Sequence, residues 1–236
     1  MGAGIFIIIP IVIAIFVIIA IFGYQQAKQR REALAGLAGQ LGWQFDPSND
    51  SSHDDEYAQF EIFRRGDRRQ AYNTLWGSLV INARNCPAKA GDFTYKVASR
   101  SGKNRRTTTY HFSYLVVQLP FSHAPELLIR AEGLFDRLAG AFGFDDIDFE
   151  SSEFSRAFHV KSSDKKFAYD VCHPRMMEFL MTTRPPMIDI ERGQCCLSDG
   201  RGCWSPEQFQ AHITWLHEFF EKWPDYLKSD LTQAQR

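Results

Sequence analysis

No charged residue occurs between Gly2 and Ala27, and the sequence also lacks the motifs that mark most enzymes. Gly66, Gly102 and Gly193 lie in predicted turns and belong to no phosphate-binding pattern. The sequence contains no C-x-x-C pair, the pattern that would indicate a structural zinc site. The 5 cysteines are odd in number and follow no regular framework, which argues against the disulfide scaffold of a small secreted domain. We therefore predict no cofactor and no metal ion.

The charge-free region contains an unbroken apolar run, Ile5–Phe22 (IFIIIPIVIAIFVIIAIF). A run of about 18 or more apolar residues is long enough to cross the hydrocarbon core of a bilayer as a helix. A cleaved signal peptide needs a basic start and a small residue just before the cut, and this sequence has neither. Apolar side chains on every face also argue against a buried core helix. We predict an uncleaved, single-pass membrane anchor.

Positive charge follows the run directly, at Lys28, Arg30 and Arg31, whereas the other flank has no basic side chain. The more basic flank of a membrane span stays in the cytoplasm. We therefore predict that the N-terminus lies outside and that the rest of the chain lies in the cytoplasm.

The remaining sequence mixes strand-like and helical patterns without regular βαβ units, which favours an α+β fold. Pro174 and Ser205-Pro206-Glu207-Gln208 are typical helix starts, the first because proline suits the first helical position and the second because it matches a capping box. We predict an N-terminal transmembrane helix followed by a largely antiparallel sheet with packed helices. The predicted parts are a transmembrane anchor (1–23), a juxtamembrane helix (24–42), a strand and acidic loop (43–56), a soluble α+β domain (57–227) and a tail (228–236).

Three shorter segments also carry a pattern. Phe60, Ile62 and Phe63 precede a turn and suggest the end of a strand, and Asp146–Glu150 alternates as a half-buried strand does. Apolar residues at helical spacing in 134–142 predict a short helix.

Basic residues are concentrated in 60–110, which contains 11 Lys and Arg against three acids (Glu61, Asp67 and Asp92), a net charge of +8 within a chain of net charge −1. They gather around two predicted turns: a first basic cluster of Arg64, Arg65, Arg68 and Arg69, and a second basic cluster of Arg100, Lys103, Arg105 and Arg106. One interpretation is contact with anionic lipid headgroups, worth about 1 kcal/mol per basic residue near the surface. The other is solvated turns that pair with the acidic remainder of the protein. The overall acidity and the lack of a recognisable module argue against nucleic acid.

Other chemistry-bearing residues lie at spacings that do not favour a site. Cys195, Cys196 and Cys203 precede His212 and His217, but two histidines five apart on a helix point about 140° away from each other. Cys172 is adjacent to His173, which we expect to cap the helix that starts at Pro174 rather than to act as a base. An acidic stretch of Asp145, Asp146, Asp148, Glu150 and Glu153 lacks the spacing of a calcium loop and suggests a solvated strand face or a partner for the basic clusters.

The stretch AEGLFDRLAGAFGFDDIDFESSEFSRAFHVKSSDKKFAYDVCHPRMMEFL (131–180) resembles a family of uncharacterised bacterial membrane proteins. RGDRRQAYNTLWG (65–77) and SGKNRRTTTYHFSYLVVQLP (101–120) look like earlier parts of the same pattern, so the likeness covers most of the region after the anchor. The resemblance implies a bacterial source and a cytoplasmic α+β domain tethered to the inner membrane. It implies no catalytic residue and no ligand.

Two function classes follow from these observations. The first is a membrane-anchored binding or scaffold protein that contacts anionic lipid or a membrane-protein partner through its basic clusters. The alternative is a membrane-tethered enzyme, for which a hydrolase is the expected class. Its site would be assembled from polar residues that sequence spacing does not reveal.

Overall fold

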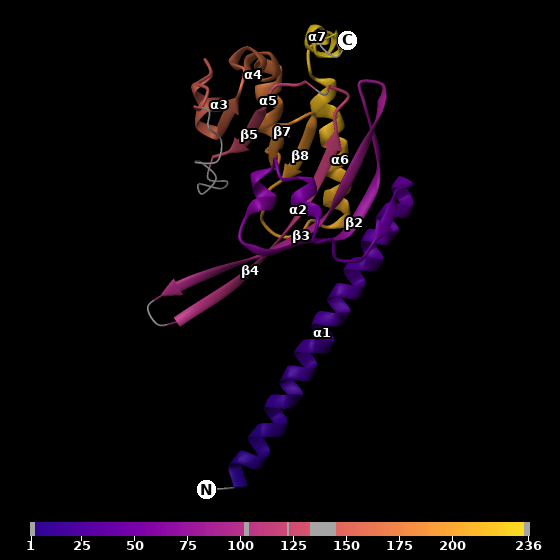
Figure 1. Cartoon of the computed structure of the whole chain (residues 1–236), viewed down its shortest axis with the longest axis vertical. Coiled ribbons are helices and arrows are strands. Elements are labelled where there is room, and N and C mark those ends of the chain that lie inside the picture. Colours follow the sequence, from indigo (N-terminus) through magenta and orange to yellow (C-terminus); the bar gives the residue numbers. More distant parts are fainter. Residues whose placement is uncertain (1–2, 102–103, 122, 133–144, 234–236) are drawn as a thin grey trace.

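The computed structural model describes residues 3–101, 104–121, 123–132 and 145–233, with only the backbone of 3–11, Arg100, Ser101, Asn104 and Arg105. Helix α1 (Ala3–Leu41) is one element of 39 residues, so the predicted anchor and juxtamembrane helix are continuous. Its N-terminal part projects from the folded body (Figure 1), where Phe16 is 68% and Phe22 60% exposed. Its segment Val12–Leu41 contains an 18-residue window with a mean hydropathy of 1.4 and is long and apolar enough to cross a membrane.

Eight strands form a single antiparallel sheet in the order β1-β2-β3-β4-β8-β7-β5-β6. This confirms the predicted α+β fold with an N-terminal apolar helix and a largely antiparallel sheet. The strands are β1 (Gln44–Asp46), β2 (Asp67–Ile81), β3 (Arg84–Ser101), β4 (Asn104–Gln118), β5 (Leu127–Ala131), β6 (Phe158–Ser162), β7 (Met187–Glu191) and β8 (Gln194–Ser198).

Each face of the sheet carries its own hydrophobic core, because successive side chains of a strand point to opposite faces. In β4, Leu115 and Val117 belong to the larger core and Val116 to the smaller one. The larger core includes buried residues of the C-terminal part of α1 and of five further helices: α3 (Ser152–Ala157), α4 (Lys165–Val171), α5 (Pro174–Thr183), α6 (Pro206–Glu221) and α7 (Asp225–Gln233). The smaller core lies under α2 (His53–Glu56) and the 3₁₀-helix η1 (Glu61–Arg64). Its aromatic residues Phe60 and Phe63 are fully buried, and the burial of each side chain stabilises the fold by about 1.5–3 kcal/mol.

The predicted helix starts are confirmed by their caps. The side chain of Ser205 accepts from the backbone N–H of Gln208, and the Gln208 side chain accepts from the backbone N–H of Ser205. His173 caps α5 through Nδ1, which accepts from the backbone N–H of Met176.

Three predicted segments differ in the structure. Phe60, Ile62 and Phe63 are all buried, and the chain curls into η1 because a straight strand would bury only alternate residues. Asp146–Glu150 forms no strand, although Ile147 and Phe149 are buried as the alternation predicts. The segment predicted as a tail from 228 is mostly part of α7 (Asp225–Gln233), because Leu227 and Leu231 bury one helical face. The helix predicted in 134–142 lies outside the described residues.

The direction in which α1 leaves the sheet is set by the first residues after it. Gly42 ends the helix with φ +67, a conformation that glycine adopts without strain. The ring of Trp43 then lies directly against Gly77 of β2, where a Cβ would overlap it. Gly77 therefore allows the close approach that seats the end of α1 on the sheet.

We expect Gly77→Ala to lower the free energy of unfolding by about 1–3 kcal/mol, the usual cost of an overpacked contact. In a chain of this size that corresponds to a fall in Tm of roughly 3–10 °C, which thermal unfolding measures. Gly36→Ala on α1 is the matched control, because nothing lies within 4 Å of the added Cβ and alanine favours a helix. Equal Tm values for the two variants would contradict the packing role of Gly77.

Candidate functional site

Arg30 joins the anchor helix to the sheet through an ion pair. Its guanidinium donates to both carboxylate oxygens of Asp92 in β3, at 2.7 Å and 2.5 Å. The Asp92 side chain is fully buried, whereas that of Arg30 is 24% exposed. Ser113 and Asn73 donate to the same carboxylate at 2.7 Å and 3.0 Å. The buried charge of Asp92 is therefore compensated on both oxygens, which such a group requires.

The same arginine also binds the loop that precedes α6, donating to the backbone carbonyl of Trp204 at 3.0 Å. Burial alone would lower the pKa of Arg30, but the hydrogen bond and the charge of Asp92 outweigh it and raise that pKa. Sequence reasoning treated Arg30 only as a topology signal. Its spacing from Leu34, Leu37 and Leu41 (i, i+4, i+7, i+11) was the available clue that it faces the domain.

The ion pair brings the domain close to the end of the apolar run. Arg30 follows Phe22 by eight residues, which is roughly 12 Å along a helix. The polar layer of a bilayer is about 5–8 Å thick on each side. If α1 spans a bilayer, the face of the domain that holds Arg30 therefore lies next to the headgroups.

The first basic cluster is partly engaged within the protein. Arg69 pairs with Asp54 at 2.7 Å and donates to the backbone carbonyl of Arg64 at 3.0 Å. Arg64 and Arg68 are exposed, and Arg65 is half-buried. The pairing of Asp67 with Lys96 places this cluster beside the point where β3 leaves the body of the sheet.

Three residues of the second basic cluster, Arg100, Arg105 and Arg106, lie at the end of a two-stranded extension of β3 and β4. We call 96–101 and 104–109 the hairpin arm. Figure 1 shows the arm projecting from the body on the side from which α1 also projects. Arg100 pairs with Arg105 across the strands and Ser99 with Arg106, whose side chain is exposed. Lys103 lies outside the described residues.

Charge and exposure distinguish the arm from an ordinary hairpin. No acidic residue occurs in 93–125, so the charged residues of the arm are all basic. At the base of the arm, Tyr95 and Tyr110 stack with ring centroids 5.1 Å apart. Tyr110 is 38% and Val97 36% exposed. Tyrosines next to basic residues are typical of segments that lie at a membrane–water interface.

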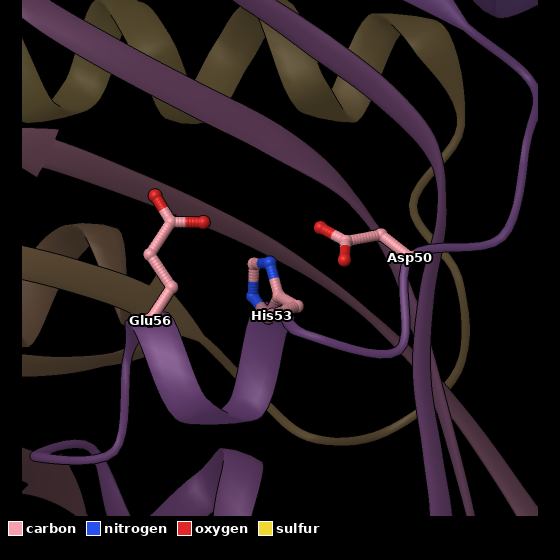
Figure 2. Close-up of side chains that lie close together, drawn as sticks. All are labelled: Asp50, His53 and Glu56. Carbon is pink, nitrogen blue, oxygen red and sulfur yellow. The ribbon is translucent and has the colours of Figure 1, made fainter.

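A second polar cluster lies at α2, beside the smaller core. Asp50, His53 and Glu56 each offer one ligand atom, and these atoms lie within 4.8 Å of one another (Figure 2). Such a set could hold a cation, but the ammonium of Lys89 already lies 2.8 Å from Glu56 and 3.4 Å from Asp50. The cluster therefore satisfies its negative charge with a side chain of the protein itself.

His53 is the buried member of this cluster. Its ring packs among Tyr57, Phe63 and Tyr114, and Nδ1 lies 3.5 Å from the Tyr114 hydroxyl. Among the described residues Nε2 has no hydrogen-bond partner. Burial lowers the pKa of His53 to about 3, with the charge of Lys89 acting in the same direction and Asp50 opposing it. His53 is therefore neutral near pH 7 and acts as part of the aromatic core.

The structure does not bring the cysteines and histidines of the C-terminal part together. Cys195 belongs to the larger core and Cys196 to the smaller one, so they point to opposite faces of β8. The ring of His212 packs against that of Trp204 with the ring centroids 4.3 Å apart, and Nδ1 of His217 lies 2.9 Å from the carbonyl of Val80.

Cys172 and His173 have separate structural roles. The pKa of the Cys172 thiol is raised by burial, and the cysteine is 1% exposed. Both ring nitrogens of His173 are engaged, Nδ1 by the N–H of Met176 and Nε2 by the carbonyl of Lys222 at 3.0 Å. These two residues therefore form no nucleophile and base couple.

Among the described side chains, Asp146 of the acidic stretch finds its partners on β6 and not in the basic clusters. Asp146 lies 3.1 Å from Nδ1 of His159 and 4.0 Å from the ammonium of Lys161, both on β6. Glu150 and Glu153 are exposed. They border a groove of about 800 Å³ between α3, α4 and α5, which no sequence pattern indicated.

Comparison with known proteins supports the fold. No family model and no curated protein matches the sequence. Among solved structures, the chain is similar to the mycobacterial trehalose monomycolate transport factor A, with a TM-score of 0.57 and 11% sequence identity. The likeness covers 82% of this chain and 96% of that one. At this identity the likeness conveys the fold alone, and the predicted resemblance to uncharacterised bacterial membrane proteins stays a prediction.

Proposed function

We propose that the protein is a membrane-anchored binding or scaffold protein whose α+β domain contacts anionic lipid headgroups through the hairpin arm. The observation that carries this proposal is the join between α1 and the sheet. Because α1 continues without interruption from the apolar run to the Arg30–Asp92 pair, the domain has no flexible linker to the membrane. A bilayer around the apolar run would then meet the arm on the same side of the body.

Charge supports the same contact. Each basic residue near an anionic surface contributes about 1 kcal/mol of binding free energy, so the four residues of the second basic cluster would together contribute roughly 4 kcal/mol. The exposed Arg64 and Arg68 lie at the base of the same arm and extend the positive surface.

The proposed location is the cytoplasmic face of a bacterial inner membrane, with the N-terminus outside. Lys28 and Arg31 remain exposed after the apolar run, and basic residues at this position favour the cytoplasmic side. All five cysteines are free, as is usual in a reducing compartment.

The test places a fluorophore sensitive to its environment on the arm of the full chain, as Thr108→Cys in a Cys203→Ser background, in lipid nanodiscs. We expect doxyl-labelled lipid to quench the label in discs with anionic lipid and to quench it far less in zwitterionic discs. Salt at 1 M should remove the difference, because the Debye length falls from about 10 Å at 0.1 M to about 3 Å.

The charge variant replaces Arg100, Lys103, Arg105 and Arg106 with Gln, and we expect it to lose most of the quenching in anionic discs. The matched control removes four exposed basic residues in or directly after α4 and α5: Lys165, Lys166, Arg175 and Arg184. Equal quenching in both lipids, or equal loss in both variants, would rule out a specific contact of the arm with anionic lipid.

A further inference from the structure

A groove on the helical side of the domain has the composition of a peptide-binding site. Its volume is about 800 Å³, and it lies between α5 on one side and Phe149–Glu153 with α4 on the other. Phe149 and Cys172 are buried beneath it, and Met177 and Met181 are half-buried. The two methionines are four residues apart on α5 and therefore form one apolar strip along that helix.

The methionine strip suits a partner that is itself a helix. Methionine side chains are unbranched and polarisable, so they adapt to varied apolar surfaces and are frequent at promiscuous helix-binding sites. Tyr169 borders the strip, with its ring 5.2 Å from that of Phe149, and is 48% exposed. The apolar lining is thus accessible to a protein partner at Tyr169, whereas a small-molecule site encloses most of its ligand.

The rim of the groove is acidic. Glu150 and Glu153 lie on one side and Glu178 on the other, and all three are exposed. Among the described residues that line the groove there is no Lys or Arg, and none of the described ion pairs involves these three glutamates. Their charge is therefore available to a cationic partner.

We infer that this groove binds an amphipathic helix of a protein partner, with an apolar stripe on Met177 and Met181 and Lys or Arg residues against the three glutamates. Figure 1 shows α3, α4 and α5 at the end of the body opposite the projecting part of α1. The helices that line the groove thus lie away from the side proposed to meet lipid, so both contacts can form at once. The inference stands independently of the lipid contact.

The test uses the full chain in zwitterionic nanodiscs and a fluorescent helical peptide of Leu and Lys, about five turns long. Fluorescence polarisation measures binding, with empty discs as the background. We expect saturable binding above this background, and none for the matched peptide in which Glu replaces Lys.

Two variants locate the binding. Glu150→Gln/Glu153→Gln/Glu178→Gln removes the rim charge at exposed positions and should weaken binding at least about fivefold at low salt, because exposed ionic contacts are individually weak but add up. Met177→Gln/Met181→Gln keeps side-chain length and should weaken binding by a similar factor. The control Asp55→Asn/Glu218→Gln/Asp230→Asn removes three exposed acids elsewhere and should change binding less than twofold. Binding no greater than that of empty discs, or equal weakening by the control and the rim variant, would overturn the inference.

Discussion

Replacing Arg30 with alanine is expected to lower the free energy of unfolding of the domain by about 3–5 kcal/mol, the usual cost of leaving a buried charge without its partner. The affected charge is the Asp92 carboxylate, which is fully buried and accepts two of its hydrogen bonds from Arg30. Urea unfolding of the full chain in detergent micelles, followed by tryptophan fluorescence, measures the change.

The matched control is Arg31→Ala, one residue further along α1, where the side chain is exposed and the change should stay within about 0.5 kcal/mol. The double variant Arg30→Ala/Asp92→Ala should lose less stability than the two single variants lose in total, because removing both partners leaves no uncompensated charge. Additive losses, or similar losses for Arg30→Ala and Arg31→Ala, would show that the pair does not hold α1 on the sheet.

We expect acidification to destabilise the domain at pH values well above the range in which carboxylates titrate. The pKa of His53 is lowered to about 3 in the folded protein, whereas an unfolded histidine has a pKa near 6.5. The unfolded chain therefore takes up a proton that the folded chain does not. The contribution of His53 to the free energy of unfolding is fully present above pH 6.5. It falls by up to about 1.4 kcal/mol per pH unit as the pH drops toward 3.

Burial also lowers the pKa of His212, to about 4, so this histidine adds to the loss in the same window. We expect His53→Phe to reduce the slope of stability against pH between 6 and 4 by about one proton. Urea unfolding at a series of pH values gives these slopes, with the exposed His217→Gln as the control for losing a histidine. A slope unchanged by His53→Phe would show that His53 accepts a proton in the folded protein.

The parts of the fold that local chemistry determines were predictable from the sequence. The apolar run, the capping box at Ser205 and the cap at His173 each depend on residues within a few positions of one another. The register of the sheet was beyond such reasoning, because pairs such as Asp67 with Lys96 depend on the course of the whole chain.

The candidate sites were predictable only in outline for the same reason. Both basic clusters were visible as charge, but their common position on the hairpin arm and its base follows from strand pairing. The Arg30–Asp92 pair joins residues 62 positions apart, and Lys89 reaches Asp50 from 39 positions away. Such contacts leave no periodic signal, and the groove between α3, α4 and α5 is likewise formed only by tertiary packing.

The most direct test of the account is whether α1 holds the domain in one orientation. Spin labels at Gln26→Cys on the exposed part of α1 and at Thr214→Cys on α6, in a Cys203→Ser background, report this by pulsed electron paramagnetic resonance in nanodiscs. We predict one narrow distance distribution that broadens when Arg30 is replaced by alanine. A broad or multiple distribution in the protein with Arg30 intact would contradict the rigid join on which the proposed lipid contact depends.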